Sequence, residues 1–453
     1  MRFGVISMAT NILDKPTGED GLRRQLGLAS ATAMVAGEVI AAGIFLTPAA
    51  MAKSVGSPFW LLVIWLVVSA MTLSGALCYG ELAGRFPRAG GTYVYLHETF
   101  GARIAFLYGW MCLLVLDPGL TAALATGVAV YAAYIFHWTP AAIKLAAVIL
   151  ILALCLMNIL SIRLSTGFLR WATWLKLGVL GFLVVWAFAF HLGSWSNLSP
   201  FFAQRVGSLP LGPALGAGMV AAFFSFGGWW DVSKMAGEVR DPARTLPRAM
   251  ALGVVIVAAV YILVSAVFLY LISLENVTSN DAFVAQAGEI LFGKVGGIVL
   301  AGIVIVCVVG GLAAFVLSVP RVYYAMAQDG LFVPAVAELH PRFGTPMNAI
   351  LIQAAVASAL VLLGSFQQIL GYFIFSAVVF LGLTVAGLFV ARRQGRVVAD
   401  VVLTWGYPVT PVVFLLLVVL LLGLLLMHGL REPLLGAAVV LAGLPVYVVL
   451  RKA

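Results

Sequence analysis

Apolar segments of about 20 residues or more recur along the whole chain, and they constrain its fold more than any other feature. An α-helix needs this length to cross the hydrocarbon core of a bilayer. Inside that core every backbone N–H and C=O group must be bonded within the protein, which favours helices over irregular chain. Only 9% of the 453 residues are charged, whereas soluble domains carry about 25%. The sequence therefore predicts an all-α integral membrane protein and excludes a soluble multidomain protein.

The apolar segments predict twelve transmembrane helices. In chain order they cover roughly residues 26–52, 59–82, 104–136, 141–162, 168–192, 212–238, 247–274, 295–327, 347–364, 367–391, 407–428 and 433–450. The loop 83–103 is basic, and we expect it to include a short surface helix.

Lysine and arginine are distributed unevenly between the two sides of the predicted membrane. With both termini placed in the cytoplasm, that side collects most of the 26 basic residues. The opposite side collects Lys53, Lys144, Arg205, Lys294 and Arg431. This bias follows the positive-inside rule, so it predicts cytoplasmic termini and explains the net charge of +9 without a nucleic-acid partner. No cleavable signal peptide is expected, because the first ~20 residues lack a continuous apolar region. The plasma (inner) membrane is the expected location.

The first apolar segment is interrupted near its middle. Residues 35–48 contain Gly37, Gly43 and Pro48, together with the single acid Glu38. Irregular backbone at this depth requires a protein-lined or watery cavity. A broken helix exposes N–H groups on one side of the gap and C=O groups on the other, which suits the carboxylate and ammonium of a zwitterion. We therefore expect a substrate site at this gap.

A second interruption is expected in the sixth segment, where residues 224–229 read Phe-Ser-Phe-Gly-Gly-Trp. The two interruptions are about 185 residues apart, which is the length of five spans and inverts the second half relative to the first. Close helix packing at Gly227-Gly228 is the simpler alternative. The inverted repeat predicts five parts of the chain: a cytoplasmic tail (1–24), a first repeat of five helices (25–192), an extracytoplasmic loop (193–210), a second repeat (211–391), and two last helices with a short cytoplasmic C-terminus (392–453).

Four motifs resemble those of the amino acid–polyamine–organocation superfamily, and within it the L-type amino acid transporters. They are Ala41–Phe45 (Ala-Ala-Gly-Ile-Phe), Tyr79–Tyr95 with its Phe-Pro-Arg-Ala-Gly-Gly core, Phe224–Pro247 with its Glu-Val-Arg-Asp-Pro run, and Pro320–Gly330. The resemblance covers nearly the first 350 residues in the order found in the family. It implies the LeuT-type fold, with ten helices in two inverted repeats of five, broken helices 1 and 6, and two peripheral helices.

The resemblance also implies a substrate site. Backbone N–H groups around Ala42 and Gly43 would bind the substrate carboxylate, and carbonyls near Val39, Ile40 and Phe224 would bind its ammonium. The aromatic ring of Phe224 would close the outer gate. The alternative for this ring is packing in the core. The expected substrate-binding residues are Val39, Ile40, Ala41, Ala42, Gly43, Phe224, Ser225, Phe226 and Gly227.

Three positions depart from the family pattern. Ala41 and Ala42 replace a glycine and a serine, which preserves the N–H groups but removes a hydroxyl and narrows the space beside the substrate α-carbon. Glu38 stands where the L-type pattern has a small neutral residue such as threonine. An acid at this depth costs roughly 2.5–3.5 kcal/mol or more unless it is paired or hydrated, so Glu38 is a functional candidate.

Lys176 lies within the fifth predicted span. In this superfamily a lysine at the matching place puts its ammonium where sodium-coupled relatives bind Na⁺, because a tethered cation bonds the same oxygens. The resemblance therefore implies sodium-independent transport. The alternative is that Lys176 extends to the cytoplasmic headgroups, as Arg170 lies six residues away.

Three acids and one lysine remain within the predicted spans. Asp231 and Lys234 are three residues apart, so they are expected to pair on one helix face. Asp117 precedes Pro118, where the L-type family tends to have arginine, and either pairs with a basic group or caps a kink. Glu38 has three open roles: a proton carrier, a counter-ion for a cationic side chain, or a structural partner of Lys176 or Lys234.

At the cytoplasmic level, four charged residues from different spans could form an inner gate, namely Glu81, Glu238, Arg244 and Arg321. Ordinary surface ion pairing and orientation signals are the alternative. No metal or cofactor is expected, because the four cysteines lack paired spacing and the five histidines lack an i,i+4 partner.

The resulting hypothesis is a sodium-independent transporter of neutral L-amino acids that works by alternating access, as an exchanger or a proton-linked carrier. A carrier of cationic amino acids or polyamines is the alternative, favoured by the intramembrane acids. A membrane-embedded enzyme would need a nucleophile–base pair, which is not evident, and a channel fits two glycine-hinged breaks less well. The expected partners are the substrate and the lipid bilayer.

Overall fold

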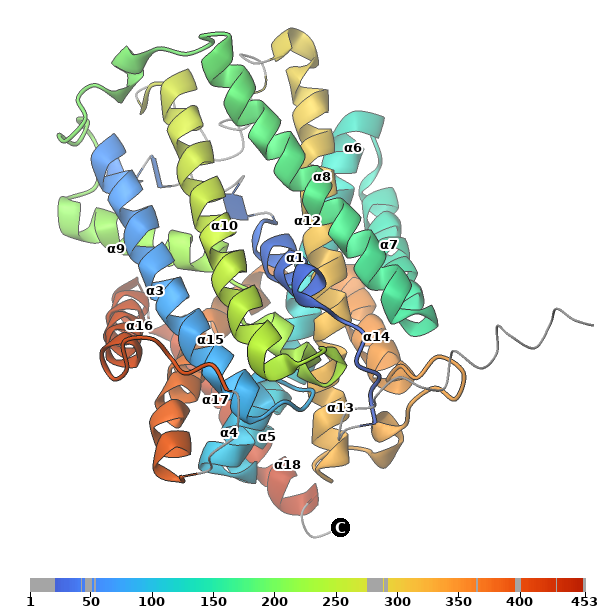
Figure 1. Cartoon of the computed structure of the whole chain (residues 1–453). Coiled ribbons are helices and arrows are strands. Elements are labelled where there is room, and N and C mark those ends of the chain that lie inside the picture. Colours follow the sequence, from blue (N-terminus) through green and yellow to red (C-terminus); the bar gives the residue numbers. More distant parts are fainter. Residues whose placement is uncertain are drawn as a thin grey trace, which may run out of the picture.

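The computed structural model describes residues 21–41, 43–44, 51–52, 54–274, 288, 292–363, 366–395, 401–428 and 430–450. Within these ranges the secondary structure is helical apart from one isolated β-bridge between Leu26 and Val239. The long helices run side by side in a bundle, and α1 lies in its middle (Figure 1). The predicted all-α architecture is confirmed for this part of the chain.

Nine helices in the described ranges are long and apolar enough to cross a membrane. They are formed by α3 (Pro58–Arg85), α5 and α6 (Ala102–Met111 and Asp117–Phe136), α7 (Pro140–Leu160), α8 (Ile162–Ala189), α10 (Pro242–Leu271), α12 and α13 (Gly296–Ser318 and Pro320–Gln328), α15 (Phe366–Arg393), α16 (Val409–His428), and α17 and α18 (Arg431–Leu441 and Gly443–Leu450). Three shorter apolar helices are α1 (Leu28–Val39), α9 (Leu211–Ser225) and α14 (Met347–Leu363). Each of the predicted segments contains one of these helices, and two of the short ones lie where the sequence predicts interruptions.

Local capping chemistry starts several of the long helices. Ser57 precedes Pro58, and its hydroxyl accepts a hydrogen bond from the Trp60 N–H. Thr139 and Pro140 begin α7 in the same way. Proline at the first helical position costs nothing, because its missing N–H would have no partner there, and the hydroxyl satisfies one of the other free donors.

Both predicted interruptions are present in the backbone. Helix α1 ends at Val39, and Ile40 leaves the helical region with φ −75° and ψ 74°. Helix α9 ends at Ser225, and five turn residues lead into the 3₁₀ segment η3 (Asp231–Glu238). Gly228 in this turn has φ +102°, a conformation that favours glycine. Helix α1 therefore ends inside the first predicted segment, several of whose following residues lie outside the described ranges, and helix α9 ends inside the sixth.

The inner ends of the two broken elements are joined through their backbones. The N–H groups of Gln25 and Leu26 donate to the Glu238 carbonyl at 2.7 and 2.9 Å, and the Arg240 N–H donates to the Leu26 carbonyl at 2.8 Å. Helix α1 also packs against α8, α10 and α12. The residues entering α1 are thus held to the end of η3.

Three details differ from the sequence-based expectation. The third span contains a π-helical turn, η1 (Cys112–Leu116), just before Asp117. Between the second and third spans, α4 (Thr92–Phe100) buries its first half, so it is not a surface helix. The eighth span divides at Val319 into α12 and α13, because Pro320 cannot donate the hydrogen bond that a continuous helix needs.

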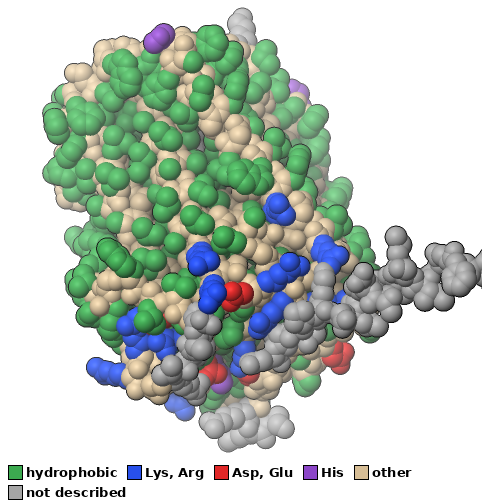
Figure 2. Space-filling view, viewed as in Figure 1, with side chains coloured by type: hydrophobic (Ala, Val, Ile, Leu, Met, Phe, Trp, Pro, Cys, Tyr) green, Lys and Arg blue, Asp and Glu red, His purple; other side chains and the backbone are tan. Residues whose placement is uncertain are grey.

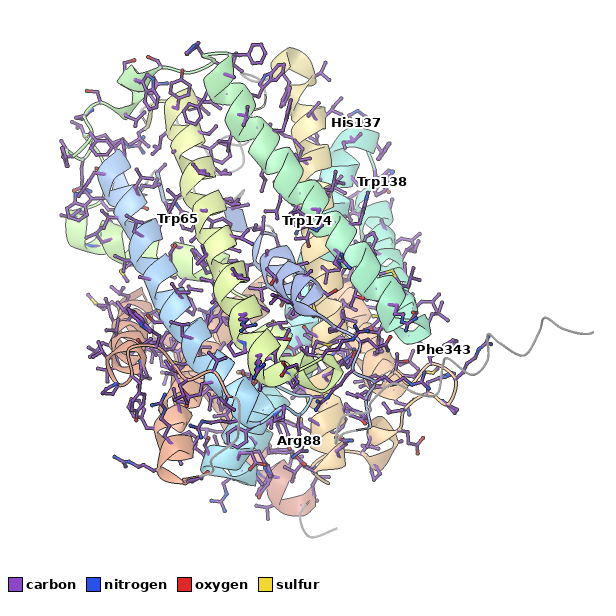
Figure 3. All side chains as sticks on the ribbon, viewed as in Figure 1. Trp65, Arg88, His137, Trp138, Trp174 and Phe343 are labelled. Carbon is purple, nitrogen blue, oxygen red and sulfur yellow. The ribbon has the colours of Figure 1, made fainter. Side chains whose placement is uncertain are left out.

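The surface has an uneven distribution of charge. Figure 2 shows a mainly apolar upper region and a group of Lys and Arg side chains toward the lower end of this face. Trp138 lies at the turn between α6 and α7, and Trp174 lies on α8 with its side chain 67% exposed (Figure 3). Exposed apolar and tryptophan side chains over long helices are typical of a surface that contacts lipid.

Candidate substrate site and buried charge network

Lys176 on α8 bonds the carbonyl groups released by the end of α1. Its Nζ donates to the carbonyl oxygens of Gly37 at 2.6 Å, Ile40 at 2.7 Å and Cys307 at 2.9 Å. The side chain is 0% exposed. The ammonium therefore has three acceptors for its three hydrogens, and an extension of Lys176 to the headgroups does not fit this geometry.

Small residues make room for this lysine and for the neighbouring helix. A Cβ on Gly37 would lie 2.5 Å from Thr173 Oγ1, and a Cβ on Gly310 would lie 3.1 Å from Lys176 Cε. The Thr173 hydroxyl donates to the Ala33 carbonyl at 3.1 Å. Close approach of α1, α8 and α12 thus depends on glycine at two of these contacts.

The hydroxyl of Tyr261 on α10 joins the two interruptions. It lies 2.7 Å from the Val39 carbonyl oxygen and 2.8 Å from the Ser225 carbonyl oxygen, and its one hydrogen serves both. The ring packs edge-on against Trp65 and Phe226. Sequence reasoning missed Tyr261, because a single tyrosine in an apolar span gives no sign of its partners.

The predicted substrate-binding residues lie around these two contacts. The carbonyls of Val39 and Ile40 already accept hydrogen bonds from Tyr261 and Lys176. A Cβ on Gly43 would lie 2.8 Å from Ser225 Cα, so the two interruptions meet closely there. Ala41 is buried, and Ala42 lies outside the described residues.

The aromatic residues of the second interruption differ in exposure. Phe224 is 42% exposed, whereas Phe226 is buried against Trp65 and Tyr261. Gly227 follows, and its N–H donates to the Phe224 carbonyl at 3.0 Å. Of the two phenyl rings, Phe224 is the one that can reach a ligand without displacing the core.

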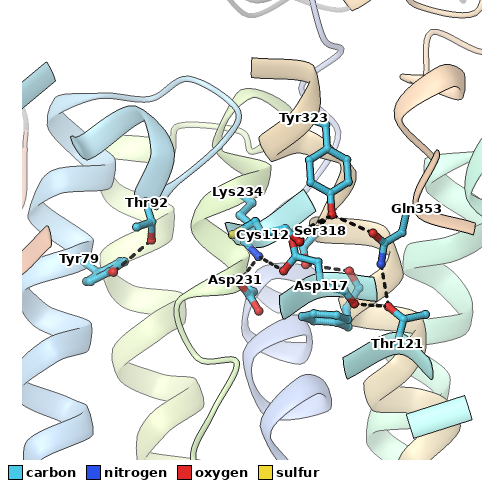
Figure 4. A network of polar contacts seen from close by, with 11 residues as sticks. Tyr79, Thr92, Cys112, Asp117, Thr121, Asp231, Lys234, Ser318, Tyr323 and Gln353 are labelled. Carbon is cyan, nitrogen blue, oxygen red and sulfur yellow. Dashed lines mark hydrogen bonds and ion pairs between the residues drawn. The ribbon is translucent and has the colours of Figure 1, made fainter. Parts of the chain in front are cut away.

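Lys234 is the centre of a buried charge network (Figure 4). Its Nζ lies 2.6 Å from Asp231 Oδ1 and 3.7 Å from Asp117 Oδ1. The Tyr323 hydroxyl is 3.1 Å from Asp117 Oδ2 and 2.8 Å from Gln353 Oε1. The expected pair of Asp231 and Lys234 is present. Asp117 lies near a basic group, as the first of its two alternatives requires, and it does not cap α6, whose N-cap is Leu116 without a side-chain hydrogen bond.

Glu38 lies next to this network, and its charged neighbours are Asp231, Lys234 and Asp117. Its side chain is 7% exposed, and neither carboxylate oxygen has a hydrogen-bond partner among the described residues. A Cβ on Gly228 would lie 2.9 Å from Glu38 Cγ, so the acid packs against the turn of the second interruption.

The four predicted gate residues lie in different contacts. Glu238 and Arg321 form a fully buried pair, with Arg321 Nε 2.9 Å from Glu238 Oε1. Glu81 binds Arg392, whose Nη2 is 2.6 Å from Glu81 Oε2. Arg244 is exposed in the first turn of α10. Surface ion pairing is therefore a wrong description of Arg321 and Glu238, because both side chains are 0% exposed.

Further partners of these groups were not predicted. Arg85 and the Thr404 N–H also bond Glu81, at 2.9 and 2.7 Å. On α4, the Tyr93 hydroxyl donates to Asp329 Oδ2 at 3.1 Å. Burial, and then the negative charge of Asp329, raise the pKa of Tyr93, so this hydroxyl stays protonated.

The family model described as "Amino acid permease" matches residues 26–444 of the chain. This match runs from the segment entering α1 to the beginning of α18. The chain belongs to the amino acid permease family. It is therefore a multi-pass membrane transporter of amino acids, and its relatives are transporters and not enzymes.

Individual relatives cover most of the permease. It is 30% identical to the serine/threonine exchanger SteT of Bacillus subtilis over 96% of this chain and 99% of that protein. It is 27% identical to the human large neutral amino acids transporter small subunit 2 over 95% of this chain and 81% of that one. The mouse Asc-type amino acid transporter 1 is 26% identical over 94% of this chain and 81% of its own length.

Proposed function

We propose that the permease transports neutral L-amino acids by alternating access and does not require sodium. The observation that carries this proposal is the Lys176 ammonium, which bonds the Gly37 and Ile40 carbonyls at the first interruption and the Cys307 carbonyl on α12. A cation fixed there satisfies by itself the oxygens that a sodium ion would need.

The fold behind the proposal is the LeuT type, with twelve transmembrane helices, two inverted repeats of five and two peripheral helices. Support comes from two apolar helices that end early, at Val39 and at Ser225. The two positions are separated by about the length of one five-helix repeat. The charge asymmetry of the loops supports cytoplasmic termini in the plasma (inner) membrane.

A neutral substrate fits the surroundings of the interruptions. N–H groups around Ala42 and Gly43 would bind its carboxylate, and the exposed ring of Phe224 would cover it. The methyl group of Ala41 narrows the space at the α-carbon, and Trp65 and Phe226 supply apolar packing behind the site. The names of relatives support the same class, since they include a serine/threonine exchanger and a large neutral amino acids transporter.

Uptake by purified permease in liposomes tests this proposal. Radiolabelled L-serine, L-threonine and L-leucine should enter equally well from sodium and choline buffers. Lys176→Ala should abolish uptake, because it leaves three buried carbonyls without their donor.

Lys144→Ala is the matched control, since Lys144 also donates to a backbone carbonyl, that of Leu362 at 2.8 Å, but is exposed. Full uptake by Lys176→Ala, or a strict need for sodium, would contradict the proposal. Competition by arginine or putrescine but not by neutral amino acids would instead indicate a cationic substrate.

A further inference from the structure

Glu38 is a buried acid at the junction of the two interruptions, and the described residues give its carboxylate no hydrogen-bond donor. It belongs to α1, and its side chain packs against Gly228 in the turn that precedes η3. Both carboxylate oxygens lack a hydrogen-bond partner within the described ranges, although the side chain is only 7% exposed. An ionised carboxylate in this position would be strongly disfavoured unless a ligand neutralised it.

The charges around Glu38 do not balance. Three carboxyl groups (Glu38, Asp117 and Asp231) lie near two ammonium groups (Lys176 and Lys234), which leaves one net negative charge if all five are ionised. The buried pair of Arg321 and Glu238 is neutral by itself. One proton would therefore bring the network to neutrality.

The contacts indicate which carboxyl group takes that proton. Asp231 has the Lys234 ammonium at 2.6 Å, and Asp117 accepts a hydrogen bond from Tyr323 and lies 3.7 Å from the same ammonium. Each aspartate thus already has a cation or a hydrogen-bond donor beside it. Glu38 has no equivalent contact in the described structure, so it binds the proton at least cost.

The other polar groups that face α1 and are described in the structure form hydrogen bonds or ion pairs elsewhere. Lys176 on α8 donates its three hydrogens to backbone carbonyls. Tyr261 on α10 bonds the Val39 and Ser225 carbonyls, and Cys307 on α12 is a free thiol. On the side of η3, Lys234 forms its ion pairs with Asp231 and Asp117.

We infer that Glu38 is a proton-binding site that couples proton movement to amino acid transport. In its neutral form the Glu38 carboxyl donates its O–H to the Asp231 carboxylate and joins α1 to η3. When the proton leaves to water on the inner side, two carboxylates face each other and their repulsion separates the two elements. The proton enters from water on the outer side, so one proton accompanies each neutral amino acid. This inference rests on the proposed function and deepens it by naming the coupled ion.

The wild-type permease in liposomes tests the coupling. With pyranine inside the vesicles and the membrane potential clamped at zero, adding L-serine outside should acidify the interior. An inward gradient of about one pH unit should raise the accumulation of L-serine up to about tenfold at a stoichiometry of one proton per amino acid. Uptake without any acidification would overturn the inference and leave the proposed function intact. Absence of uptake would instead reject the proposed function.

Variants test the residue. Glu38→Gln should abolish both the acidification and the effect of the pH gradient, whereas Glu338→Gln, at an exposed glutamate, should retain both. If Glu38→Gln does not fold, Asp231→Asn tests the acceptor of the same hydrogen bond. Proton flux that persists in either variant would refute the assignment. The wild type could also show no proton flux while Glu38→Gln binds L-serine more weakly. That result would make Glu38 a counter-ion and would also overturn the inference.

Discussion

Removing the hydroxyl of Tyr261 should weaken substrate binding more than any comparable change elsewhere in the permease. This one oxygen lies 2.7 Å from the Val39 carbonyl and 2.8 Å from the Ser225 carbonyl, so it fixes the spacing between the two interruptions. Tyr261→Phe retains the edge-on packing against Trp65 and Phe226. The variant therefore isolates the hydrogen bond from the rest of the side chain.

The expected magnitude follows from the hydrogen bonds lost with the hydroxyl, chiefly the one to the Ser225 carbonyl, because the Val39 carbonyl keeps the Ala41 N–H at 2.8 Å. Leaving a buried polar group unsatisfied costs about 1–3 kcal/mol, and the free energy of unfolding should fall by this amount. If about 1.4 kcal/mol of that loss appears as misalignment of the substrate groups, the KM for uptake rises about tenfold. The maximal rate of uptake should change less, because the substitution leaves every charged and gating side chain in place.

Initial rates of L-serine uptake into liposomes over a range of concentrations give the KM, and thermal unfolding in detergent gives the stability. Tyr134→Phe is the matched control, because Tyr134 is exposed on α6. An unchanged KM and unfolding midpoint for Tyr261→Phe would refute the claim that this hydroxyl sets the geometry of the site. A stability loss with an unchanged KM would restrict its role to packing.

Two further variants test the close contacts around the interruptions. Gly43→Ala should cost about 1–3 kcal/mol of stability and most of the uptake, because its Cβ would lie 2.8 Å from Ser225 Cα, a backbone atom that cannot rotate away. Gly127→Ala is the control, since a Cβ at Gly127 would have nothing within 4 Å. Equal stability of the two variants would refute the reasoning. Arg321→Gln should lower the unfolding free energy by about 3–5 kcal/mol, because the buried Glu238 carboxylate loses the guanidinium that compensates its charge. The double variant Arg321→Met/Glu238→Leu should recover most of that loss in the same thermal assay, and no recovery would contradict the ion-pair explanation.

Much of the fold could be predicted because membrane burial acts on short stretches of sequence. Apolar length identified the segments, and the glycines near residue 43 and at Gly227-Gly228 indicated which two helices are broken. The π-helical turn at 112–116 could not be predicted, since nothing in its apolar sequence differs from an ordinary helix. It places Asp117 at the start of a new helix, where the carboxylate meets Lys234.

The candidate site was predicted less completely, because its contacts join residues far apart in the chain. Lys176 and Glu38 could be singled out as charges within apolar segments, but their surroundings could not. Lys176 bonds the Cys307 carbonyl, and a backbone carbonyl carries no mark in the sequence. Arg321 and Glu238 were placed at one membrane level, yet the sequence did not show that they are fully buried.

The interruptions are stable only because distant side chains satisfy the backbone groups they release. A break in an apolar helix leaves carbonyl oxygens without their usual donors, and lipid offers none. Here the donors come from α8 and α10, through Lys176 to Gly37 and Ile40 and through Tyr261 to Val39. The glycines allow the backbone to leave the helical conformation, and the hydrogen bonds of Lys176 and Tyr261 hold it in the observed non-helical conformation. The shape of the substrate site is therefore a property of the packed bundle, and changes on α8 or α10 should alter it as strongly as changes within α1.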